Sequence, residues 1–120
     1  MATLNVKLNL DSKDARSDAL NFTVSDTLTT TDPISEGRKS IATGSAQEIL
    51  ASNSAFSYTY IKVISGTNTT DYVQVKLAGN VCFKMRVGEF AFFPGYNAHQ
   101  IQGESYGGAC IVEFKQWSIS

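Results

Sequence analysis

The residues of this sequence that could do chemistry are few, and their types and spacing limit that chemistry. His99 is the single histidine. A metal site built on several histidines, or a serine or cysteine nucleophile that needs an imidazole base, would therefore depend on this one residue. No nucleophile motif flanks it, so we expect His99 to be a strand-end or surface residue.

The acidic residues offer a second route, because two carboxylates can act as a general acid and base in glycoside hydrolysis. The candidates are Glu48, Glu89, Glu104 and Glu113. Nothing in their spacing selects a pair, and the pair Gly107-Gly108 predicts a tight turn better than a phosphate-binding loop. We expect a protein that is not an enzyme, with no catalytic residue, no cofactor and no metal.

The two cysteines, Cys82 and Cys110, lie 28 residues apart inside apolar segments. This placement favours free thiols over a disulfide or a metal pair. We expect both to point inward or half-inward in neighbouring strands.

The composition argues against several partners. Ten basic and 11 acidic residues give a net charge of −1, so the basic surface typical of nucleic-acid or anionic-membrane binding is missing. Charged residues make up only 18% of the chain, whereas Ser and Thr account for 24 of 120 positions. The N-terminus has no basic region leading into an apolar run, and no apolar stretch approaches the roughly 20 residues that span a bilayer. The sequence predicts a mature protein made in the cytosol, with no nucleic-acid or membrane partner.

The elements that must position these residues are predicted by two-residue alternation of apolar and polar side chains in short runs. About nine or ten antiparallel strands are expected, at residues 3–10, 20–24, 38–42, 46–50, 56–64, 71–77, 81–87, 89–93, 98–102 and 108–114. This number in one chain favours an all-β fold, a β-sandwich of the jelly-roll kind, as a single domain over residues 1–120.

Some segments carry a more specific expectation. Residues 11–19 predict an exposed loop or helical turn, and residues 46–50 fit either a strand or a helical turn. Residues 27–35 contain Pro33 and predict a polar connection that could pair only at a sheet edge. Residues 56–64 are β-branched or aromatic almost throughout, which is typical of a central strand covered on both faces. Residues 71–77 and 81–87 should form a hairpin.

Two regions are candidate protein-contact surfaces. In residues 90–93, alternation puts Phe90 and Phe92 on one face and Phe93 on the other, so one face would be exposed in a monomer. We select Phe93, with Tyr96 beyond the Pro94-Gly95 turn. The N-terminal strand, residues 1–10, is a possible docking or exchanged arm, with the apolar side chains Leu4, Val6 and Leu8.

Residues 56–116 resemble small virion proteins of tailed bacteriophages. The resemblance is carried by the strand DYVQV at residues 71–75, by GEFAFFP at residues 88–94 and by the last strand at residues 110–114. It implies a β-sandwich or jelly-roll structural protein and carries over no catalytic residue.

The resemblance further implies a capsid decoration or cement protein, located in the virion after synthesis in the host cytoplasm. It would self-associate, as a homotrimer, and bind the major capsid protein or another virion protein through several weak contacts. A tail or neck structural protein is one alternative. A carbohydrate-binding β-sandwich module is another, since exposed tyrosines can stack on sugar rings.

Overall fold

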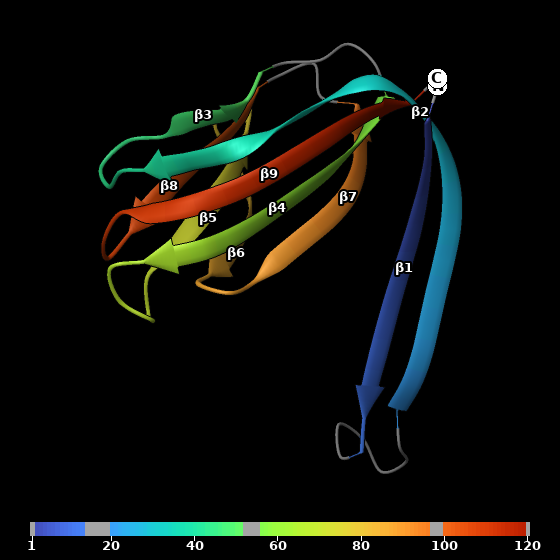
Figure 1. Cartoon of the computed structure of the whole chain (residues 1–120). Coiled ribbons are helices and arrows are strands. Elements are labelled where there is room, and N and C mark those ends of the chain that lie inside the picture. Colours follow the sequence, from blue (N-terminus) through green and yellow to red (C-terminus); the bar gives the residue numbers. More distant parts are fainter. Residues whose placement is uncertain (1, 14–19, 52–55, 97–99, 120) are drawn as a thin grey trace.

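The computed structural model describes residues 2–13, 20–51, 56–96 and 100–119, and these residues form nine strands in two antiparallel sheets. The strands are β1 (Ala2–Ser12), β2 (Leu20–Ile41), β3 (Gln47–Leu50), β4 (Phe56–Gly66), β5 (Tyr72–Leu77), β6 (Asn80–Arg86), β7 (Phe90–Tyr96), β8 (Ile101–Tyr106) and β9 (Cys110–Ile119). One sheet has the order β1-β2-β9-β4-β7, and the other β3-β8-β5-β6. We call them sheet A and sheet B. The predicted all-β sandwich is confirmed (Figure 1).

The strand order is that of a jelly roll. Strand β5 pairs with β6, β4 with β7, β3 with β8, and β2 with β9. The chain is thus paired as one long hairpin whose successive strand pairs alternate between the sheets, which generates the jelly-roll arrangement. Of residues 46–50, for which a helical turn was the other possibility, residues 47–50 form strand β3.

The core lies between the two sheets and follows the predicted alternation. Its fully buried members include Ile61 and Val63 of β4, Val73 of β5 and Val112 of β9. The predicted hairpin of residues 71–77 and 81–87 is present as β5 and β6. In the part of the chain that the structure describes, no helix is long and apolar enough to cross a membrane.

Strand β4 differs from its prediction. It does lie between two neighbours, β9 and β7. Its inward side chains are buried, but Tyr58 and Tyr60 on the other face remain partly exposed. The strand is therefore not covered on both faces, because the outer face of sheet A borders an open cleft.

Strand β2 corrects one part of the prediction and agrees with another. Residues 27–35 belong to one continuous strand and not to a connection. Beyond Thr30 this strand pairs with β9 alone, so Pro33 lies at the edge of the sheet, as predicted. A register shift between Thr31 and Ser35 leaves Pro33 without a paired residue. The proline is tolerated because this irregularity needs no ladder hydrogen bond from its nitrogen.

The β1–β2 hairpin extends away from the sandwich as an arm, and we call residues 2–12 and 20–30 the arm (Figure 1). The radius of gyration is 15.7 Å, compared with about 14 Å for a compact chain of this length. The arm accounts for the larger value. Its base lies where β1 begins and β9 ends, since Thr30 pairs with both Ala2 and Ile119.

Asp71 ties together two turns at one end of the sandwich. Its side chain is buried, and Oδ2 accepts a 2.7 Å hydrogen bond from the backbone N–H of Asn68. The turn between β8 and β9 passes directly against this carboxylate. A Cβ on Gly107 would collide with Oδ1, and one on Gly108 would lie 2.8 Å from Oδ2. Gly107 also has a φ of +91°, which disfavours other residues.

The cysteines are both free, but their placement differs from the prediction. Cys110 in sheet A is buried, whereas Cys82 in sheet B is exposed, so the two do not lie in neighbouring strands. A register shift pairs Val75 with Phe83 but Lys76 with Val81, and Cys82 between them has no partner residue. This bulge breaks the alternation and also leaves Val81 exposed.

We predict that the two thiols differ in reactivity. Cys82 should react rapidly with a thiol reagent in the folded protein, whereas Cys110 should react only after unfolding. Burial raises the pKa of the Cys110 thiol and shields it, and both effects slow the attacking thiolate. Titration with an aromatic disulfide should find one fast group per native chain and two in denaturant. Cys82→Ser should remove only the fast group, and two fast groups would contradict the assignment.

Candidate functional site

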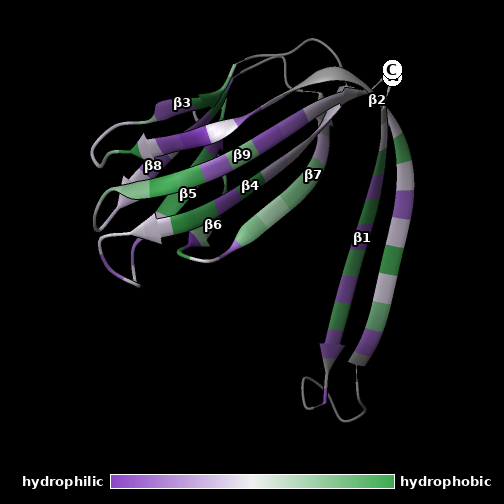
Figure 2. Cartoon of the chain, in the orientation of Figure 1, coloured by the Kyte–Doolittle hydropathy of each residue, from purple (hydrophilic) through white to green (hydrophobic). Residues whose placement is uncertain are grey.

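The arm is amphipathic, with one apolar face and one polar face. Directly opposite residues of an antiparallel pair point to the same side, so the register defines each face. Leu4 lies opposite Leu28, and the pattern continues toward the tip with the pairs Val6–Asp26, Leu8–Val24 and Leu10–Phe22. We call this the apolar face of the arm, and Figure 2 shows the alternation along both strands.

The opposite face of the arm is built from Asn, Thr, Ser, Lys and Asp side chains. Thr27 Oγ1 donates to Asn5 Oδ1 and Thr23 Oγ1 donates to Asn9 Oδ1, each at 3.2 Å. These cross-strand bonds suit a surface that stays in water. The polar face of the arm is therefore suited to water, and the apolar face to contact with another apolar surface.

The apolar face is partly covered at the base of the arm and open near its tip. Leu4 and Val6 are partly buried, but Leu8, Leu10, Phe22 and Val24 are 43%, 45%, 46% and 49% exposed. A two-stranded hairpin is marginally stable in water unless its apolar face is covered. The outer part of the arm therefore leaves four apolar side chains open to solvent.

The outer face of sheet A carries an aromatic surface, which we call the floor. It consists of the side chains Tyr58, Tyr60, Phe90, Phe92 and Trp117. The ring of Phe92 lies 5.3 Å from that of Tyr58 and 6.3 Å from that of Trp117, measured between centroids. Strands β9, β4 and β7 bring the rings together although they lie far apart in sequence.

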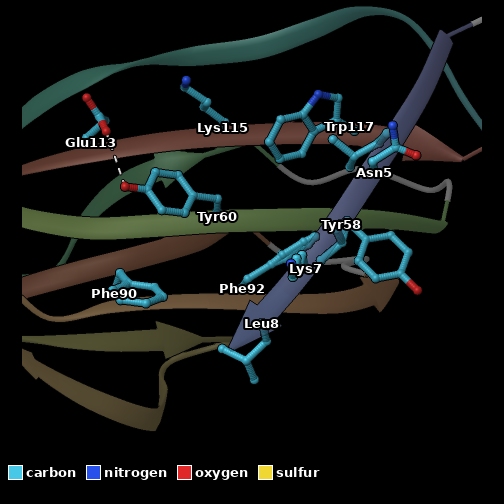
Figure 3. A pocket seen from close by; sticks show the side chains of 12 residues that line it. Asn5, Lys7, Leu8, Tyr58, Tyr60, Phe90, Phe92, Glu113, Lys115 and Trp117 are labelled. Atoms are coloured by element: carbon cyan, nitrogen blue, oxygen red, sulfur yellow. Dashed lines mark hydrogen bonds between the residues drawn. The ribbon is translucent and has the colours of Figure 1, made fainter. Parts of the chain in front are cut away.

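The arm and the floor enclose a cleft of about 700 Å³. One wall is formed by residues 4–8 of β1, which include the polar Asn5 and Lys7, and the other by the aromatic side chains together with Glu113 and Lys115 (Figure 3). Phe90, at the end of the floor, is 61% exposed. A cleft lined mainly by apolar side chains suits an apolar chain segment or a flat ring better than a polar substrate.

A group of charges borders the floor and is organised by Glu113. Its carboxylate accepts a hydrogen bond from the Tyr60 hydroxyl and one from the Arg38 guanidinium, both at 3.3 Å. Lys115, on the same face of β9, lies 4.0 Å from Glu36, and both of these side chains are exposed. The Lys115 ammonium therefore has room for a second carboxylate.

The pKa of Tyr60 is raised from its ordinary value, first by burial and then by the charge and hydrogen bond of Glu113. We predict that Glu113→Gln lowers this pKa without returning it fully to normal, because burial remains. In the wild-type protein, the stability that is linked to the raised Tyr60 pKa is fully present below the ordinary tyrosine pKa. It is lost as the pH rises through the raised pKa of the folded state. Ultraviolet titration of tyrosinate, with Tyr60→Phe to identify the signal, checks the shift. An unchanged pKa in Glu113→Gln would contradict it.

The contact residues that were selected from the sequence lie in different parts of the structure. Leu4, Val6 and Leu8 all line the cleft. Phe93 lies instead on the inner side of β7, packed edge-on against Phe83 at 5.8 Å. Tyr96 pairs through its backbone with Phe56, and its side chain lies outside the described residues.

Sequence reasoning missed the floor, although alternation had placed Phe90 and Phe92 on the same face. The signal was the pair of tyrosines two residues apart, Tyr58 and Tyr60, in a strand expected to be covered on both sides. Trp117, near the C-terminus, lies beyond the last predicted strand and carried no expectation. What was missing was the strand order that puts all of these rings on one surface.

The acidic candidates are dispersed. Glu104 accepts a 2.7 Å bond from Lys76 on the outer face of sheet B, and this bond, with a second from Tyr106, lowers its pKa. Glu89 accepts from the backbone N–H of Arg86 in a turn. His99 and the turn beside it lie outside the described residues. Among the residues that the structure describes, no group of three or more His, Cys, Asp or Glu could hold a metal ion.

The outer face of sheet B is polar and contrasts with the floor. The rings of Tyr72 and Tyr106 stack at 5.2 Å, and the Lys84 ammonium lies 5.4 Å from the centre of the Tyr72 ring. The two tyrosine rings and the lysine ammonium therefore contact one another on this polar surface. The apolar cleft on sheet A is therefore the better candidate for binding.

No protein-family model, curated protein or solved structure matches this chain.

Proposed function

We propose that the protein is a structural component of a bacteriophage virion, a decoration or cement protein that binds the capsid surface and stabilises it. It is synthesised in the host cytoplasm, associates into homotrimers and acts without enzymatic activity. The proposal takes its viral setting from the resemblance of residues 56–116 to small virion proteins.

The observation that carries the proposal is the arm with its exposed apolar face. A hairpin with Leu8, Leu10, Phe22 and Val24 each more than 40% exposed is a liability for a protein that works alone. It is useful to a protein that assembles. On a symmetric shell, several such contacts act together through effective concentration, so each can be weak.

The test is binding to particles. The purified chain, added to shells prepared without it, should sediment with them and raise the temperature at which they open. Mass spectrometry should also find the chain in purified particles of the virus that encodes it. Binding should depend only weakly on salt, because few charges are available. A chain that neither sediments with shells nor occurs in particles would refute the proposal, and one found only in tails would favour the tail or neck alternative.

A carbohydrate-binding module is the second candidate, and the floor favours it. Tyr58, Phe92 and Trp117 form a partly exposed aromatic surface outside the core, on which sugar rings could stack. A glycan array probed with wild-type protein and with Trp117→Ala separates the two functions. Glycan binding that disappears in Trp117→Ala while particle binding persists would assign the floor to sugars.

A further inference from the structure

We propose that the floor of each copy binds the arm of a second copy of the same chain, which lies apolar face down on the aromatic side chains. This inference names the partner of the proposed assembly surface and so rests on the proposed structural role. It is nevertheless tested without any virus particle.

The two surfaces complement each other in polarity. The tip of the arm presents Leu8, Leu10, Phe22 and Val24 on one side, and the floor presents aromatic rings that the chain's own arm leaves open toward Phe90. Packing one face of a hairpin on the face of a sheet is the ordinary way in which two β-layers bury apolar side chains. The polar face, with its Asn–Thr bonds, would remain in solvent.

The surfaces also complement each other in charge. Asp26 is the charged residue that the described part of the apolar face carries, and the floor is bordered by Lys115. Tyr60 separates Phe92 from Lys115, so these two residues lie two strand spacings apart, about 10 Å. Phe22 and Asp26 lie four residues apart on one strand, about 13 Å. An arm that enters the cleft with Phe22 over Phe92, and crosses the strands of sheet A toward β9, would therefore bring Asp26 within reach of the Lys115 side chain.

The contact joins unlike surfaces, an arm and a floor, so copies related by it close into a ring when the rotation allows. Each copy then gives one arm and receives one. A ring of three copies would match the proposed homotrimer. The closed ring leaves no apolar arm or floor unsatisfied.

Cross-linking between copies tests the contact directly. In a Cys82→Ser background, Leu10→Cys is prepared in one batch and Phe92→Cys in another. Mixing and mild oxidation should give a disulfide-linked heterodimer. Leu10→Cys mixed with Lys84→Cys, on the outer face of sheet B, is the matched control and should give none. If one chain carrying both Leu10→Cys and Phe92→Cys closes on itself at every concentration, the arm covers its own floor and the proposal is wrong.

Substitutions on the two faces of the arm provide a second measurement. Leu10→Ser with Phe22→Ser, one opposed pair of the apolar face, should weaken self-association by at least about 100-fold in sedimentation equilibrium. Asn9→Ser with Thr23→Ser, the neighbouring pair on the polar face, should leave it nearly unchanged. Equal thermal stability of both variants would show that the sandwich is intact. Equal association of both variants with wild type would overturn the proposal.

Charge reversal tests the orientation of the arm. Asp26→Lys should weaken association by about 10-fold through like charges at Lys115. Adding Lys115→Glu to the same chain should restore most of the affinity. Rescue supports this placement of the arm, and an Asp26→Lys effect without rescue contradicts it.

The outcomes also separate this inference from the proposed function. Arm-to-floor cross-links in a chain that does not bind particles would keep the inference and remove the virion role. A chain that binds particles but is monomeric at its highest soluble concentration would do the reverse.

Discussion

Ile61→Ala is expected to lower the free energy of unfolding by about 4 kcal/mol. Ile61 is fully buried on the inner face of β4, between the two sheets. Removing its outer carbons loses their transfer free energy and leaves a cavity that the flanking strands cannot close, because β9 and β7 hold β4 on both sides.

The matched control is Ile111→Ala, which removes the same atoms from a side chain that is 39% exposed on β9. Its cost should stay below about 1.5 kcal/mol, since little cavity forms at the surface. Urea unfolding followed by the fluorescence of Trp117, the single tryptophan, measures both values. Similar costs at the two positions would mean that the space between the sheets is not the core.

Gly107→Ala should cost about 3 kcal/mol, from two sources. A residue with a Cβ is disfavoured at a φ of +91°, and the added methyl would collide with the buried Asp71 carboxylate. The Asp71 carboxylate cannot easily move away from the added methyl group, because its hydrogen bond with the Asn68 N–H holds it in place.

Gly79→Ala separates the two sources. Gly79 has a similar φ of +81°, but no heavy atom lies within 4 Å of the position that an added Cβ would take. It should therefore show only the backbone cost, about 1 kcal/mol. In an Asp71→Ala background, the penalty of Gly107→Ala should fall toward the Gly79→Ala value. Thermal unfolding of the four variants completes this cycle, and equal penalties at Gly107 and Gly79 would show that Asp71 does not constrain the turn.

Alternation predicted the sheets wherever strands were regular. Residues 71–77 and 81–87 were identified as a hairpin, and Val73, Val75 and Met85 point inward as expected. The prediction failed at Val81 and Cys82, because a bulge changes the register and alternation carries no information about bulges. The prediction also divided β2 at Pro33. The sequence around a proline does not show whether a register shift will place the proline where no ladder hydrogen bond is needed.

The candidate site was predicted only in part. The alternation of Leu4, Val6 and Leu8 predicted an N-terminal strand with one apolar face, and these three side chains line the cleft. The floor depends on the pairing of β4 with both β7 and β9, and such pairings across 28 residues or more are not encoded in any local pattern. For the same reason Phe93 was chosen over Phe90 and Phe92, since alternation separates two faces without saying which one is inside.

The nested pairing has a consequence for the order of events during synthesis. The floor needs β9, which leaves the ribosome after the other eight strands that the structure describes, whereas the arm needs only β1 and the first part of β2. A nascent chain can therefore pair β1 with β2 before its own floor has been synthesised. Because domains fold largely as their chain emerges, neighbouring nascent chains on one messenger RNA would carry arms but no floors. If arms bind the floors of other copies, as proposed, this topology delays that contact until β9 has been synthesised.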